Sequence, residues 1–345
     1  MRKFIFVTGF ALISTISFPS YAEFESQASV PKTSGDPFNS RLWEASVRTY
    51  FGHNDNVQLT PDRSPFYSGD ETKSAFFGAT FNGLVIVPLS DSLTVGAALK
   101  LNTISYLDEM PPALVANNGE FRDYNMVNVD PSVFTRYSFD ALGMPANVGL
   151  TYSFHQEKAK NVEAVDLESH TFTIDGKVMV RQDTQLGLVY SHSNNEFGVV
   201  FPGVPASNRD SKYNAVTLSA QHWFSGRRRS VSAGVTFANN DAEGRDWDYH
   251  GYTVNGAFRS HLCGPIYGKI DGSYSDLDYK GGFTNIVAAP GREYQKVKQV
   301  GLQLLWQFND RITFDAYFNR EHYDSNMPQF EGENTIKGLG MTFNF

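Results

Sequence analysis

Long apolar runs are missing from this sequence beyond its first two dozen residues. A membrane-spanning helix needs about 18 consecutive apolar residues, so the rest of the chain could cross a bilayer only as strands. Cysteine is almost absent, and the single Cys263 excludes an internal disulfide. The net charge of −8, with no basic stripe, gives no sign of nucleic-acid binding. Because the sequence also lacks a Gly-rich phosphate loop, a Cys/His metal cluster and a nucleophile elbow, it predicts no cofactor and no metal.

A two-faced pattern recurs instead from residue 41 to the end of the chain. In the last segment Leu339, Met341, Phe343 and Phe345 share one parity, and small or polar residues take the other. Strand side chains alternate between two faces, and no segment with helical periodicity is available to cover the apolar one. We therefore expect lipid to cover it. The mean hydropathy of −0.34 is compatible with this, because a transmembrane barrel alternates lipid-facing and interior residues.

Fourteen segments fit the alternating pattern and predict an all-β fold, an antiparallel up-and-down transmembrane β-barrel. Their approximate spans are 41–51, 74–87, 92–105, 125–138, 145–155, 169–181, 184–193, 213–224, 230–238, 249–260, 266–275, 297–308, 311–320 and 335–345. Long polar links alternate with tight turns at 88–91, 140–144, 182–183, 225–229, 261–265 and 309–310. Outer-membrane barrels alternate short periplasmic turns with longer extracellular loops, so the pattern predicts an even strand number with both termini in the periplasm.

The first 40 residues have a different character. Residues 1–22 combine a positive start, a short apolar stretch and a small-x-small site at Ser20 to Ala22, which predicts a signal peptide. An uncleaved membrane helix is the alternative, but the apolar stretch is short for one. Residues 23–40 are predicted to be a disordered periplasmic leader, and residues 41–345 the barrel.

Aromatic residues gather near the predicted strand ends on the lipid-facing parity. These are Tyr137, Phe139, Tyr152, Phe154, Tyr190, Phe224, Trp306 and Phe308. Such positions suit the aromatic girdles that flank the apolar band of a membrane barrel. Ordinary enrichment of aromatics in strands is the alternative.

The C-terminal residues carry a resemblance to a known class. Met341, Phe343 and the terminal Phe345 look like the signal that the barrel-assembly machinery recognises, and nearly the whole chain resembles Gram-negative outer-membrane β-barrel proteins. The resemblance implies the cell outer membrane as location, and outer-membrane lipid and lipopolysaccharide as surroundings.

A weaker similarity connects residues 52–57 and 323–326 to the barrel domains of surface lipoprotein assembly modifiers, which usually carry helical repeats that this chain lacks. It implies a surface or periplasmic protein partner.

Parity places a set of charged residues inside the predicted barrel. They are Glu44, Arg48, Lys100, Asp130, Arg136, Asp175, Lys177, Arg181, Arg259, Lys269, Asp271 and Asp315. Charges inside a barrel must be hydrated or paired, so they either line a solute pathway or form a salt-bridged filling. The slight excess of basic groups favours anions if the path is open.

Enzymatic barrels are the rival class. A lipase-like dyad would have to come from Ser191-His192-Ser193-Asn194-Asn195, but adjacent residues of a strand face opposite ways, so His192 and Ser193 point apart. Asp246, Asp248 and His250 have a spacing suggestive of an omptin-like protease, although they equally describe a hydrated hairpin tip. The sequence favours a non-enzyme with no catalytic residues.

Charged residues in the links between strands indicate function less specifically than the inward charges do. The acidic loop residues Asp55, Asp62, Asp70, Glu71, Asp276 and Asp278 could hold calcium or bridge lipopolysaccharide through divalent ions. They lack the regular ligand spacing of a calcium loop, so solvated surface is the default. Arg227 to Arg229, in a predicted turn, could contact anionic headgroups or a periplasmic partner. The sequence best fits a porin or passive channel for small hydrophilic solutes, with a filled, partner-binding barrel as the alternative.

Overall fold

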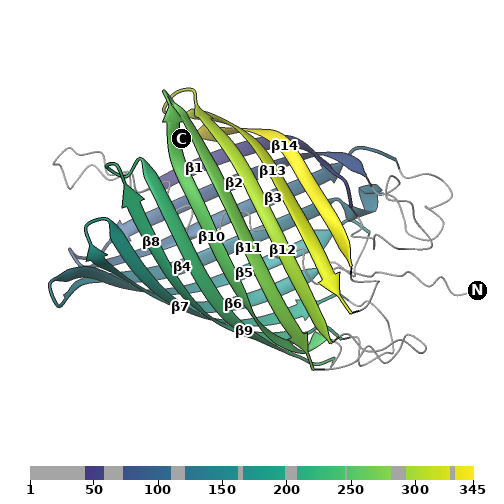
Figure 1. Cartoon of the computed structure of the whole chain (residues 1–345), viewed down its shortest axis with the longest axis horizontal. Coiled ribbons are helices and arrows are strands. Elements are labelled where there is room, and N and C mark those ends of the chain that lie inside the picture. Colours follow the sequence, from purple (N-terminus) through teal and green to yellow (C-terminus); the bar gives the residue numbers. More distant parts are fainter. Residues whose placement is uncertain are drawn as a thin grey trace, which may run out of the picture.

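Fourteen antiparallel strands, each paired with its neighbours in the sequence, close into a barrel in the computed structural model (Figure 1). The structure describes residues 43–57, 73–109, 121–161, 166–198, 208–244, 247–280, 293–326 and 331–345. Within these ranges the elements are β1 (Trp43–Asn54), β2 (Ser74–Pro88), β3 (Leu93–Tyr106), the 3-10 helix η2 (Phe121–Tyr124), β4 (Met126–Ala141), β5 (Met144–Ala159), β6 (Leu167–Arg181), β7 (Thr184–Phe197), β8 (Ser211–Phe224), β9 (Arg229–Ala242), β10 (Tyr249–Cys263), β11 (Ile266–Tyr279), β12 (Tyr294–Gln307), β13 (Ile312–Ser325) and β14 (Gly332–Asn344). In the described ranges, no helix has both the length and the apolar character to cross a membrane.

Each strand has one apolar face that no protein layer covers. On β4, Val133 is 56% exposed and lies opposite Ala97 of β3, whereas the neighbouring Ser132 is buried. Leu339 of β14 is 66% exposed, and the neighbouring Gly340 is buried. A soluble protein rarely exposes so continuous an apolar surface, so the outer face of this barrel is a lipid-facing surface.

The barrel closes where β1 pairs with β14, a junction that we call the seam. The register runs from Ser46 opposite Asn344 to Asn54 opposite Ile336, and the amide of Phe345 donates to the carbonyl of Ala45 at 2.9 Å. The first strand therefore starts, and the last strand ends, at the same end of the barrel as the short turns. Closure leaves no strand edge unpaired, which a bilayer requires because it offers no water to satisfy backbone groups.

The predicted strand number and order are confirmed, but several strands are longer at the loop end than the sequence indicated. The fifth ends at Ala159 instead of 155, the thirteenth at Ser325 instead of 320, and the eleventh at Tyr279 instead of 275. The backbone ladder continues past the point where the apolar alternation stops, because hydrogen bonding between strands does not depend on apolar side chains. The predicted signal peptide and leader lie outside the described residues.

The short turns use special backbone conformations. Leu142 and Gly143 both have positive φ, 57° and 81°, as a two-residue hairpin requires, and Gly143 donates its amide to Asp140. Ser225, Gly226 and Arg227 also have positive φ, between 52° and 69°. The predicted periplasmic Arg227 therefore sits in a strained turn, with its guanidinium 5.2 Å from the ring of Trp223.

Candidate functional site

The barrel interior is formed by the parity opposite to the lipid-facing residues, and on β7, β8 and β9 it is uncharged. The inward side chains there are mostly small or hydroxyl-bearing: Ser191, Ser193, Asn195, Thr217, Ser219, Gln221, Ser230, Ser232 and Thr236. We call this surface the hydroxyl wall. Its residues pair across strands, with Thr217 and Thr236 at 2.8 Å. These three strands are described in full, and none of their charged residues shares the inward parity.

Charged inward residues lie on one side of the hydroxyl wall, on β3 to β6. Lys100 stands directly opposite Asp130, whose carboxylate contacts Nδ1 of His155 on β5. This contact occurs where Pro131, which has no amide proton, interrupts the ladder between β4 and β5. Glu157, two residues beyond His155, is also buried and points inward. The group Lys100, Asp130, His155 and Glu157 thus joins three strands through charges.

A second charged region lies on the other side, from β10 round to β1. Lys269 and Asp271, two residues apart on β11, approach to 3.3 Å. The guanidinium of Arg259, on β10, lies 5.5 Å from the ring of Tyr267. Charged groups of opposite sign therefore neighbour one another on the interior surface, and the hydroxyl wall separates the two regions.

One ion pair ties the seam from inside. Arg48 of β1 reaches across β14 to Asp315 of β13, with Nη2 at 2.6 Å from Oδ2 and Nε at 3.1 Å from Oδ1. The rings of Tyr50 and Tyr317 flank the guanidinium at 4.9 and 5.2 Å. Glycine at 340 makes the crossing possible, because a Cβ there would lie 2.6 Å from Oδ1 of Asp315. We call these residues the closing clamp.

Apolar side chains fill part of the interior beside the clamp. Tyr50, Phe76 and Ile104 form a buried cluster, against which Tyr106, Tyr317 and Ile336 pack. Gly52 and Gly78 leave the necessary room, since a Cβ at either position would overlap Phe76 or Tyr50. The interior is therefore packed over β13, β14 and β1 to β3, on the loop side of the barrel.

The sequence-predicted charged residues do not form one cluster. Glu44, Arg136, Asp175 and Lys177 share the inward parity on β1, β4 and β6, and Asp175 is buried above Gly149. Arg181 lies at the turn end of β6, beyond a shift in the β6–β7 register, and is exposed. As a functional site the set stays a prediction.

The inward residues that the sequence did not identify include Glu157, Glu321 and His155. Glu157 lies beyond 155, where the fifth strand was expected to end, and Glu321 lies beyond the expected end of the thirteenth at 320. His155 was the last residue of its predicted strand and was not assigned a face. Continued alternation of polar residues past the apolar region was the available signal for all three.

The structure shows where the residues of the two possible catalytic sites, lipase-like and protease-like, lie. His192 faces outward, with Nδ1 at 2.9 Å from Oδ1 of Asn214, while Ser193 faces inward and contacts Thr171. The local dyad therefore cannot form. His250 lies 3.8 Å from Asp278, and Asp248 pairs with Lys280 at 2.9 Å. Asp246, Asp62, Asp70 and Glu71 fall outside the described residues, and within those residues no group of three potential metal ligands occurs.

A buried cation anchors the loop ends of the wall strands. The Arg209 guanidinium lies 4.6 Å from the ring of Phe197 and 5.9 Å from that of Trp247, and it donates to the carbonyl of Gly198. Burial lowers the pKa of Arg209 to about 10, and the neighbouring Asp210 opposes that shift. The contacts hold β7, β8 and the segment before β10 together at the rim.

These features define the class. A closed barrel with an apolar outer surface and a polar, charge-bearing interior is an outer-membrane β-barrel protein, and its place is the outer membrane. The aromatic residues Tyr137, Phe139, Tyr152, Tyr190, Phe224, Trp306 and Phe308 are exposed on its outer face.

Several solved structures are similar to this chain. A TodX monoaromatic hydrocarbon channel mutant matches with TM-score 0.49 and 10% identity over 88% of this chain and 89% of that chain. OmpT of Vibrio cholerae with loop L8 deleted matches with TM-score 0.46 and 10% identity over 88% of this chain and 98% of that chain. OccAB1 of Acinetobacter baumannii matches with TM-score 0.45 and 11% identity over 88% of this chain and 96% of that chain. No protein-family model and no curated protein matches the sequence.

Proposed function

We propose that the protein is a passive channel for small hydrophilic solutes. The hydroxyl wall is the observation that carries the proposal: three adjacent strands present small, uncharged hydrogen-bonding groups to the interior. Such a surface exchanges hydrogen bonds with water and solutes without binding either tightly, which conduction requires.

Unpaired polar atoms support a wet interior. Oδ1 of Asn128, Oδ1 of Asn147 and Oδ2 of Asp175 are buried and have no hydrogen-bond partner among the described protein atoms. Buried acceptors are normally satisfied, and an interior that holds water satisfies them.

The charge balance favours weak ion selectivity. Among the residues that parity predicts to face inward, basic groups outnumber acidic ones, which by itself would favour anions. With Glu157 and Glu321 included, the inward acids equal the basic groups in number. We therefore expect neutral polar solutes and ions of either sign to pass.

The test is conductance in a planar bilayer, followed by selective blocking. In a Cys263→Ser background, Thr217→Cys places a thiol on the hydroxyl wall, and Val216→Cys places one on the lipid-facing side of the same strand. A charged thiol reagent should lower the conductance of the Thr217 variant and leave the Val216 variant unchanged. Folded wild-type protein without any conductance would reject the channel.

The apolar cluster around Tyr50, Phe76 and Ile104 favours a second candidate, a filled barrel that binds a partner through its loops. Aromatic packing across the interior is the expected structure of a barrel that conducts nothing. Absence of conductance in the same experiment would favour this alternative.

A further inference from the structure

A group of basic side chains lies on the outer face of the barrel, around the seam. Lys298 of β12 stands directly opposite His322 of β13, and Lys337 of β14 stands directly opposite His53 of β1. Arg320, two residues before His322 on the same face, lies between the two lysines. We call these five residues the outer basic patch.

The patch sits where the lipid-facing surface ends. Along β12 the same face continues from Lys298 to Val300, which is 50% exposed, and then to Leu302. Along β14 it continues from Lys337 to Leu339. All of these strands reach the patch at their long-loop end, which is the extracellular end of such a barrel. The cations are therefore level with the headgroups of the outer leaflet.

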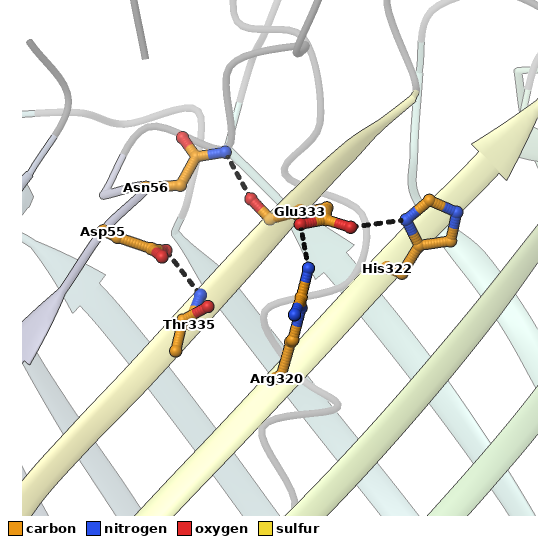
Figure 2. Close-up of polar contacts among 6 residues, drawn as sticks. All are labelled: Asp55, Asn56, Arg320, His322, Glu333 and Thr335. Carbon is orange, nitrogen blue, oxygen red and sulfur yellow. Dashed lines mark hydrogen bonds and ion pairs between the residues drawn. The ribbon is translucent and has the colours of Figure 1, made fainter. Parts of the chain in front are cut away.

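One acidic residue organises part of the patch, as Figure 2 shows. Glu333 of β14 accepts from Nη2 of Arg320 at 2.5 Å and lies 3.3 Å from Nδ1 of His322. Its own backbone is held, since Nδ2 of Asn56 donates to the Glu333 carbonyl at 2.9 Å. The backbone amide of Thr335, the next residue of that face, donates to the carboxylate of Asp55. Arg320 thus has a fixed position within the patch.

The two lysines are different. Neither Lys298 nor Lys337 forms an ion pair with any residue that the structure describes. The acidic groups nearest in register to Lys298 are Asp324 and Asp276, which both stand opposite Lys296. Those nearest to Lys337 are Glu333, already paired, and Asp55, which accepts from the amide of Thr335. Two cations at the edge of an apolar surface, without acidic partners, need an anion from elsewhere.

Outward lysines elsewhere on the loop end have an acidic residue beside them. Lys158 of β5 lies 3.7 Å from Glu168, and Lys212 of β8 stands directly opposite Asp241 of β9. Lys298 and Lys337 differ from these lysines because no acidic residue in the described ranges is paired with them or stands directly opposite them.

We propose that the outer basic patch binds the phosphate groups of an outer-leaflet lipid. Ammonium and guanidinium groups bind phosphate through charge-assisted hydrogen bonds, and Arg320 is already positioned by Glu333. A lipid is favoured over a free anion because the apolar surface directly below, at Val300, Leu302 and Leu339, accommodates acyl chains while the patch holds the headgroup. This inference does not depend on whether the barrel conducts.

The test measures binding of phosphorylated lipid A to the folded full-length chain in detergent micelles. Lys298→Ala/Lys337→Ala should weaken binding roughly 25-fold, the effect of losing two basic groups near an anionic surface. Lys158→Ala/Lys212→Ala is the matched control and should bind as the wild type does. Lys298→Arg/Lys337→Arg keeps both charges and should retain the affinity.

Heat-modifiable gel mobility verifies that each variant is folded, and the single variants Lys298→Ala and Lys337→Ala, with roughly fivefold losses each, replace the double variant if it does not fold. Equal affinity of the double variant and the wild type, or an equal loss in the control, would overturn the proposal. So would equally tight binding of dephosphorylated lipid A. Displacement of the lipid by an equal concentration of inorganic phosphate would assign the patch to a free anion and reject the lipid.

Discussion

At the scale of single residues, adjacent side chains on one strand face two different environments, the lipid and the barrel interior. Ala97 of β3 stands between the exposed Val85 and Val133 on the outer face, and Ala98 stands between Leu84 and Ser132 on the inner face. Ala97→Arg should lower the free energy of unfolding by about 2 to 4 kcal/mol, because it places a charge at the bilayer midplane. Ala98→Arg, the control, should cost much less in a hydrated interior. Urea unfolding in lipid vesicles measures both, and equal losses would contradict a wet interior.

A second residue-scale prediction concerns the glycine beneath the closing clamp. Gly340→Ala adds a methyl group that would lie 2.6 Å from Asp315 and 2.9 Å from Arg48, whereas a Cβ at Gly176 meets nothing within 4 Å. Forcing the clamp apart should cost about 1 to 3 kcal/mol, in the range of other overpacking substitutions. Gly176→Ala should be close to neutral. The same urea titration compares them, and similar midpoints would show that the ion pair rearranges without cost.

At the scale of strands, alternation in the sequence was enough to predict every strand and the order of the strands, but not the 3-10 helix η2. The apolar parity also identified the outer face, since Leu339, Val133 and Ile270 are exposed there. The loop ends of the strands were not predictable in the same way, because both faces become polar beyond the lipid. Glu157 and Glu321 were missed for this reason, and with them the balance of interior charge.

The last strand carries an element-scale prediction. Phe345 is 58% exposed on the outer face, and its amide donates to Ala45 across the seam. If Phe345 ends the assembly signal together with Met341 and Phe343, its deletion should reduce the folded protein in the outer membrane. Phe345→Tyr keeps an aromatic ring at the C-terminus and serves as the control. Outer-membrane yield and heat-modifiable mobility measure the effect, and an unchanged yield for the deletion would place the signal elsewhere.

At the scale of the whole molecule, the alternation of short turns and long links sets the orientation in the membrane. In a Cys263→Ser background, a cysteine at Asn208, before β8, should react with an impermeant thiol reagent on intact cells. A cysteine at Asp310, in the turn between β12 and β13, should not. Cysteines at Asn118 and Asn285, in two other long links, should label as Asn208 does, and Asp91 should behave as Asp310. The opposite labelling pattern would show that the barrel is inserted in the reverse orientation.

The sequence predicted the class of the molecule far better than its interior. The parity of a residue in its strand predicts whether its side chain faces inward. The pairing of Arg48 with Asp315 joins residues 267 positions apart, and no local sequence pattern predicts it. The apolar cluster on Tyr50, Phe76 and Ile104 is equally non-local, because its members come from three strands. Whether a barrel conducts depends on such packing, so the candidate site followed from the sequence only as a set of inward charges.

The closing clamp also bears on the order in which the barrel folds. Thirteen of the pairings between strands join neighbours in the sequence and can form as hairpins, while β1 and β14 lie at opposite ends of the chain. Bringing such distant segments together has the largest entropic cost, so the seam is expected to form last. Until then both edge strands are open to pairing with another chain. By adding an ion pair to the last contact, Arg48 and Asp315 slow the reopening of the seam, which would expose both edges again.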